Sequence, residues 1–123
     1  MKAILVVDDD YSLRSGIKTM MACLFPSITV LEAENGQDGL IIAQSEHPDM
    51  ILLDENMPVM SGYETAKALK QLPLICQTPL IGISGNSPLD PVTQNLRQLC
   101  DAWLPKPFSP DDLLLLVISC EAM

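Results

Sequence analysis

Acidic side chains and one lysine stand at three points of this 123-residue chain where chemistry could take place. Aspartates at positions 8–10 follow an apolar run at 4–7, and Asp54 follows a second apolar run at 50–53. Lys106 lies near the end of the chain, between two prolines. Because the carboxyl ends of buried parallel strands meet at one edge of a sheet, we expect these groups to lie together. Crowded carboxylates repel one another unless a cation lies among them, so the pattern predicts a site for a divalent metal ion and a phosphoryl group.

Each acidic residue of this set suits one part of phosphoryl chemistry. Mg²⁺ takes one or two carboxylates and completes its octahedron with neutral oxygens, water and phosphate oxygens. Asp8, Asp9 and Asp54 meet that demand, and the backbone carbonyl of Asn56 offers a neutral oxygen. Asp54 is also the predicted nucleophile, because an aspartate oxygen can attack phosphorus and form an acyl phosphate. Asp10 begins the connection to the next helix and is a better candidate for a helix cap than for a ligand.

Two further polar residues follow later apolar runs. Ser84 ends the run at 80–83, and its hydroxyl can donate to a phosphoryl oxygen. Lys106 is held in an extended segment by Pro105 and Pro107, so its ammonium can act as a point charge on phosphate. Alone, each of these residues could be an ordinary loop residue; together, at one sheet edge, they predict a phosphoryl site.

Two hydrolytic alternatives fit the residues less well. A serine nucleophile in a G-x-S-x-G turn needs glycine at position 86, where this chain has Asn86, and the single histidine, His47, follows a different segment from Ser84. A hydrolase that uses Asp54 would need a second acid two residues later, where Asn56 stands. We therefore favour phosphoryl acceptance over hydrolysis.

Composition excludes several classes of function. The net charge is −9, and the seven basic residues are scattered, so we expect no nucleic-acid binding. No window approaches the ~18 apolar residues of a membrane helix, and no small-residue cleavage site follows the short apolar start. The four cysteines are widely spaced without a C-x-x-C pair, which favours reduced thiols. We expect a soluble cytoplasmic protein that does not bind membranes.

Strand-like and helical patterns alternate along the whole chain. Strands are predicted at 3–7, 29–33, 50–53, 80–83 and 102–104, and helices at 12–24, 37–45, 63–71, about 90–100, and from 109 onward. Ser109 is the predicted cap of the last helix, with Pro110 in its first turn. Five such units predict an α/β fold with a doubly wound parallel sheet between two helix layers.

The chain resembles the response-regulator receiver domains of two-component signalling. The matching segments are ILVVDDD at 4–10, LLDENMPVMSG at 52–62, ISG at 83–85 and LPKPF at 104–108, and the likeness covers the whole chain. The resemblance implies a flavodoxin-like three-layer sandwich with strand order 2-1-3-4-5. It also implies one receiver domain over residues 1–123 with no output domain, either as a stand-alone protein, which we favour, or as a piece of a longer one.

The resemblance also assigns roles. Asp54 would accept the phosphoryl group from a histidine of a kinase or a phosphotransfer protein, in a self-catalysed switch that is not a metabolic enzyme. Asp9 would bind Mg²⁺ directly and Asp8 partly through water, and the carbonyl of Asn56 would complete the protein ligands. Lys106 would pair with Asp54 first and with the phosphoryl group later.

Four positions carry family features or departures from them. Ser84, which would move to contact the phosphoryl group, replaces the commoner threonine, and Gly85 replaces the commoner alanine. Trp103 stands at the aromatic switch position, where tyrosine or phenylalanine is usual. The peptide bond between Lys106 and Pro107 would be cis.

The last helix predicts a docking face. Its apolar run has more leucines than one inner stripe can use: we expect an inner set of Leu113, Leu116, Val117 and Cys120 and an outward set of Leu114, Leu115 and Ile118. With the fourth helix and fifth strand, the outward set would form a surface for an output partner or a homodimer. A module with this fold that binds partners without using phosphate is the alternative function.

Overall fold

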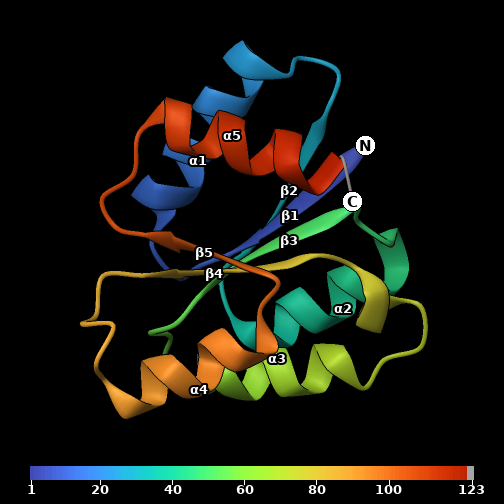
Figure 1. Cartoon of the computed structure of the whole chain (residues 1–123). Helices are drawn as coiled ribbons and strands as arrows, with labels where there is room; N and C mark the ends of the chain where they lie inside the picture. Colours follow the sequence, from blue (N-terminus) through green and yellow to red (C-terminus); the bar gives the residue numbers. More distant parts are fainter. Residues whose placement is uncertain (122–123) are drawn as a thin grey trace.

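The computed structural model describes residues 1–121, in which strands and helices alternate from one end to the other (Figure 1). The strands are β1 (Ala3–Val7), β2 (Thr29–Ala33), β3 (Met50–Asp54), β4 (Leu80–Ser84) and β5 (Ala102–Pro105). The helices are α1 (Tyr11–Leu24), α2 (Gly36–Glu46), α3 (Gly62–Lys70), α4 (Pro91–Leu99) and α5 (Pro110–Glu121). A short 3₁₀ helix, η1 (Ile75–Gln77), precedes β4; the sequence patterns did not predict it.

The strands form one parallel sheet in the order β2-β1-β3-β4-β5. Helices α1 and α5 cover one face, and α2, α3 and α4 cover the other, which gives three layers (Figure 1). The predicted fold class and strand order are therefore confirmed. Since all strands run the same way, the five strand ends and the loops after them share one edge, on the left of Figure 1.

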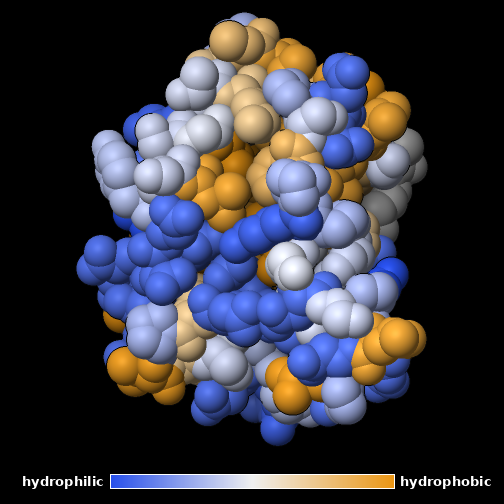
Figure 2. All heavy atoms as spheres, turned by 90° about the vertical axis from the view of Figure 1, so that its left-hand side faces the viewer, coloured by the Kyte–Doolittle hydropathy of each residue, from blue (hydrophilic) through white to orange (hydrophobic). Residues whose placement is uncertain are grey.

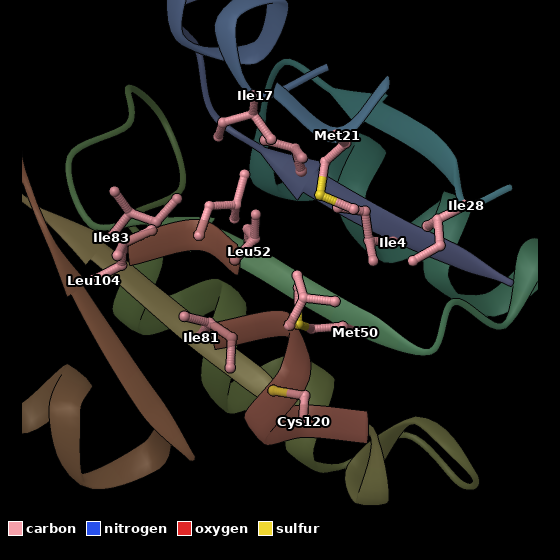
Figure 3. Close-up of a cluster of buried hydrophobic side chains, with 13 residues drawn as sticks. Ile4, Ile17, Met21, Ile28, Met50, Leu52, Ile81, Ile83, Leu104 and Cys120 are labelled. Carbon is pink, nitrogen blue, oxygen red and sulfur yellow. The ribbon is translucent and has the colours of Figure 1, made fainter. Parts of the chain in front are cut away.

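Alternating side chains of the central strands fill two separate cores. Ile4 of β1 and Leu52 of β3 pack under α1 and α5, in the cluster drawn in Figure 3. Leu5 and Leu53 point to the opposite face and pack under α2, α3 and α4. All four side chains are essentially inaccessible to water. Burial on both faces explains why these strands read as continuous apolar runs instead of alternating ones.

Side-chain caps fix where the helices begin. Asp10 accepts hydrogen bonds from two backbone N–H groups at the start of α1, as predicted, and Asp90 caps α4 in the same way. Ser61 and Glu64 form a reciprocal capping box on α3. Ser109 accepts a hydrogen bond from the N–H of residue 112, which confirms it as the cap of α5.

Helix α5 divides its apolar residues nearly as predicted. Leu113 and Val117 are fully buried and Cys120 is almost so, whereas Leu115 and Ile118 are 64% and 49% exposed. Leu116, predicted to be inner, is half-buried and packs against the buried core, and the prediction was wrong for Leu114, which is half-buried and not outward. The outward surface of this helix is thus narrower than the sequence suggested.

All four cysteines are free thiols, as expected: Cys23 and Cys76 are exposed, Cys100 is half-buried and Cys120 is buried. Among the described residues, no helix is both long enough and apolar enough to cross a bilayer.

Candidate functional site

The carboxyl edge of the sheet brings the predicted acidic residues and lysine together. Asp8 and Asp9 follow β1, Asp54 ends β3, and one carboxylate oxygen from each lies within 4.8 Å of the others. The ammonium nitrogen of Lys106, which follows β5, lies 2.8 Å from Oδ1 of Asp54 and 3.7 Å from Oδ2 of Asp8. Figure 2 looks onto this edge, where hydrophilic residues form a band across the middle of the molecule. The peptide bond from Lys106 to Pro107 is cis, as the family resemblance implied.

Burial makes this cluster electrostatically costly. Asp8 is 0% exposed and Asp54 is 3% exposed. Burial raises the pKa of Asp8 to about 6; the hydrogen bond from the Asp10 N–H opposes the rise, and the charge of Asp54 adds to it. Burial likewise raises the pKa of Asp54, against the hydrogen bond and charge of Lys106. A cation beside Asp8 and Asp54 would stabilise the charged forms of these buried carboxylates.

The surroundings of Lys106 favour its charged form, whereas those of Asp8 and Asp54 favour their neutral forms. Burial favours its neutral form, but the hydrogen bond and charge of Asp54, with the charge of Asp8, outweigh burial and raise its pKa. The lysine therefore stays charged and partly neutralises the site. One positive charge facing three carboxylates still leaves the cluster net negative.

One buried oxygen shows that these residues fit a divalent metal ion. Oδ1 of Asp8 accepts a hydrogen bond from the Asp10 N–H, but Oδ2 of Asp8 is buried and accepts no hydrogen bond from residues 1–121, with the ammonium nitrogen of Lys106 3.7 Å away. A buried carboxylate oxygen without a donor is costly unless a cation completes its environment. With Asp9 and Asp54 beside it, this oxygen set is the kind that Mg²⁺ prefers.

Asn56 lies in the exposed loop after β3, and its side-chain amide pairs with that of Asn86 after β4. The two amides exchange hydrogen bonds of 3.1 and 3.4 Å. They thereby connect the two loops that flank Asp54 and Ser84 on the sheet edge.

Ser84 reaches the same edge but does not face Asp54. Its hydroxyl donates to Oε1 of Glu55 at 2.6 Å and accepts from the N–H of Asn86 at 2.9 Å. The hydroxyl of Thr93 on α4 lies 2.9 and 2.8 Å from the two carboxylate oxygens of Glu55 and shares its single proton between them. The serine-hydrolase alternative finds no support, because His47 precedes β3 and so lies toward the opposite edge of the sheet.

Sequence reasoning missed Glu55 and Thr93, both of which are buried. One signal was available for Glu55: it continues the alternation of Ile51 and Leu53, whose side chains pack under α2, α3 and α4. A carboxylate on a strand face that is otherwise apolar needs a polar partner in the helix layer.

Arg14 was missed as well. Its guanidinium is buried, donates to the backbone carbonyl of Asp8 at 2.6 Å, and pairs with Glu32 at 3.2 Å. It thereby fixes the turn that carries Asp8 and Asp9. The signal was an arginine on the inner stripe of α1, three residues before the buried Ile17.

Trp103 lies directly on β4. It pairs in register with Gly82, and a methyl group added at Gly82 would overlap the indole, with Cζ3 only 2.1 Å away. The guanidinium carbon of Arg97 on α4 lies over the indole, 5.4 Å from the ring centroid. The large aromatic ring is accommodated because its strand neighbour has no side chain.

Glycine is also required at position 62, though not for its dihedral freedom. A Cβ there would lie 2.4 Å from the backbone oxygen of Asp54 and 2.8 Å from the Cα of Glu55. The start of α3 therefore packs directly against the backbone that carries Asp54.

Comparisons with known proteins agree with this geometry. The response regulator receiver domain family matches residues 4–118. The chain is 39% identical over 112 residues to the nitrate/nitrite response regulator protein NarL of Escherichia coli (strain K12), an alignment that covers 90% of this chain and 50% of that protein. The chain thus spans about half the length of the curated relatives it matches.

Two solved structures show the same fold. Chemotaxis protein CheY4 of Vibrio cholerae is 30% identical, with a TM-score of 0.86 and 98% of each chain covered. The receiver domain of sensor histidine kinase PA1611 of Pseudomonas aeruginosa PAO1 has a TM-score of 0.90, covering 99% of this chain and 98% of that one. At 24% identity that second likeness concerns the fold alone; its own structure has a magnesium ion coordinated in the active-site cleft.

Proposed function

We propose, because this chain belongs to the family of response regulator receiver domains, that Asp54 accepts a phosphoryl group from a phosphorylated histidine of a kinase or phosphotransfer protein. The observation that carries the proposal is the contact of Lys106 with Asp54 at 2.8 Å, at the point where three carboxylates meet. The chain is then a signalling switch that promotes its own phosphorylation and dephosphorylation, and not a metabolic enzyme.

In the transfer, one bond to phosphorus replaces another. A carboxylate oxygen of Asp54 forms a bond to phosphorus while the bond from phosphorus to the histidine nitrogen breaks, and the imidazole leaves with that electron pair. Mg²⁺ would be held by Asp8, Asp9, Asp54 and the carbonyl of Asn56, where its charge would offset that of the phosphoryl oxygens. The buried, unbonded Oδ2 of Asp8 supports this ligand set.

Two side chains would respond to the new group. Lys106 now donates to Asp54 and would donate instead to a phosphoryl oxygen, over a short distance that its flexible stem allows. Ser84 would turn its hydroxyl from Glu55 toward the phosphoryl group. Both changes act on β4 and β5 and so would reach the face formed by α4, β5 and α5, which we propose binds an output partner or a second copy of this chain.

Replacement of Asp54 tests this function. We expect wild-type protein with Mg²⁺ and a small phosphodonor such as acetyl phosphate to gain one phosphoryl group, mapped by mass spectrometry to the peptide containing Asp54. Asp54→Asn should gain none, because an amide is no nucleophile toward phosphorus. Asp111→Asn, a change of the same chemistry at an exposed residue of α5, should behave like wild type.

Labelling of Asp54→Asn at the same peptide would refute the assignment. A wild-type chain that binds Mg²⁺ yet takes up no phosphoryl group would favour the alternative, a receiver-fold module that binds partners without phosphate.

A further inference from the structure

Glu55 is a buried carboxylate next to the proposed acceptor, and the function proposed above gives it no role. It is 3% exposed, and none of the ion pairs formed within residues 1–121 includes it. Instead its two oxygens are held by hydroxyl groups, one from Ser84 on β4 and one from Thr93 on α4. A charge buried in this way depends on those two donors.

The alternation of the strands explains why Ser84 meets Glu55. Successive residues of a strand point to opposite faces, so Asp54 and Glu55 direct their side chains to different helix layers. Glu55 continues the series of Ile51 and Leu53, under α2, α3 and α4. Ser84 continues the series of Leu80 on β4, which packs in that same layer. The hydroxyl must therefore leave the layer of Glu55 before it can contact a group on Asp54.

A serine hydroxyl has a single proton to donate. Ser84 can give it to the carboxylate of Glu55 or to a phosphoryl oxygen on Asp54, but not to both. We propose that Glu55 is the positioning residue that holds the Ser84 hydroxyl away from Asp54 and so sets how readily the phosphorylated arrangement forms. This rests on the proposed function, because it specifies how the phosphoryl group would be recognised.

Thr93 links the competition for the Ser84 hydroxyl to helix α4, because Thr93 also donates to Glu55. While Ser84 donates to Glu55, the carboxylate has hydroxyl donors from both β4 and α4. Once Ser84 turns to the phosphoryl group, Thr93 is the remaining hydroxyl donor to this buried charge. The position of α4 relative to β4 is thus coupled to the state of Asp54 through one carboxylate.

Two substitutions should shift this balance in opposite directions. Glu55→Gln keeps the shape and removes the charge, so Ser84 is held less strongly, and the phosphoryl analogue beryllofluoride, titrated in saturating Mg²⁺, should bind roughly 3- to 10-fold more tightly. Thr93→Val leaves Glu55 dependent on Ser84 alone, so beryllofluoride should bind roughly 2- to 5-fold more weakly. Glu46→Gln, at an exposed position on α2, is the control and should change nothing.

The double variant with Ser84→Ala separates positioning from simple charge repulsion. If Glu55 acts through Ser84, the effect of Glu55→Gln should fall below about twofold in the Ser84→Ala background. An undiminished effect there would mean that Glu55 only repels the anion, and it would overturn the proposal. Thr93→Val binding as tightly as wild type, or more tightly, would overturn it too.

Hydrogen exchange gives a readout that does not depend on phosphoryl transfer. Beryllofluoride should slow amide exchange at the start of α4 in wild type, because Thr93 is then the remaining hydroxyl donor to Glu55, whereas Glu55→Gln, which loses the charge that holds Thr93, should exchange faster there without the analogue. If α4 exchange in wild type does not respond to bound beryllofluoride, the coupling through Glu55 is wrong. A wild-type chain that binds no beryllofluoride at all would instead refute the proposed function itself.

Discussion

Asp8 holds a charge that the fold keeps out of water. Burial raises its pKa from 3.8 to about 6, so the folded protein binds this proton more tightly than the unfolded chain does. The associated stability is fully present below pH ~4 and is lost as the pH rises through about 6, because ionisation of Asp8 then costs more in the folded state. Asp8→Asn should therefore stabilise the metal-free protein at pH 7–8 by about 1–3 kcal/mol, since asparagine keeps the acceptor oxygen for the Asp10 N–H.

Urea unfolding in EDTA at several pH values measures this difference. The gap between Asp8→Asn and wild type should open between pH ~4 and ~6 and then stay constant. Asp9→Asn, at an exposed position, is the comparison and should change the free energy of unfolding by less than about 0.5 kcal/mol. An Asp8→Asn protein less stable than wild type at pH 8 without metal would contradict the burial penalty.

At the scale of single residues, the sequence predicted the charged groups of the site, and the resemblance implied the pairing of Lys106 with Asp54, but Glu55 and its partners were missed. Asp54 and Lys106 could be placed because each lies at the end of an apolar run, a feature visible locally. The contacts of Glu55 with Ser84 and Thr93 span 29 and 38 positions. They depend on the register between β3 and β4 and on where α4 packs against the sheet, and no local sequence pattern specifies either of these.

At the scale of elements, α5 tests whether an apolar surface is core or interface. Leu115 and Ile118 are half exposed or more, so Leu115→Asp with Ile118→Asp should lower the free energy of unfolding by less than about 1 kcal/mol. Leu113→Ala, at a fully buried position, should cost about 2–5 kcal/mol. If the proposed docking face is correct, sedimentation in Mg²⁺ and beryllofluoride should show association of wild type, or binding of its partner, that the double aspartate variant loses.

Unchanged association in the double variant would remove α5 from the docking face. A large loss of stability would instead mean that these side chains are core.

Capping residues and apolar periodicity predicted where the helices and strands lie. The differences of one residue at their ends arise because these signals do not report backbone hydrogen bonding. Helix α1 begins one residue earlier than predicted, since Asp10 caps it from the position just before Tyr11. Strands β3 and β4 each extend one residue further than their apolar runs, so the strands themselves include Asp54 and Ser84. Apolar content marks burial, whereas strand pairing continues through polar residues that the sheet needs at its edge.

At the scale of the whole molecule, metal binding should narrow the difference in stability between wild type and Asp8→Asn. A ligand that binds only the folded state adds about 1.4 kcal/mol when present at ten times its Kd. Wild type should therefore melt a few degrees higher with Mg²⁺ at that level, and Asp8→Asn, which has lost a ligand oxygen, should gain much less. The advantage that Asp8→Asn has in EDTA should then shrink by about 1 kcal/mol as Mg²⁺ is added.

Differential scanning calorimetry with and without Mg²⁺ checks this change, and Asp111→Asn, exposed on α5, is the matched control. Equal Mg²⁺ stabilisation of wild type and Asp8→Asn would exclude Asp8 from the ligand set.

The packing of Trp103 on β4 has a practical consequence. It is the only tryptophan in the chain, so all indole emission arises from one ring. That ring lies against Gly82, two residues before Ser84, and is covered by Arg97 of α4. Fluorescence of the unlabelled protein should therefore report, in real time and without modification, any rearrangement where β4, β5 and α4 meet.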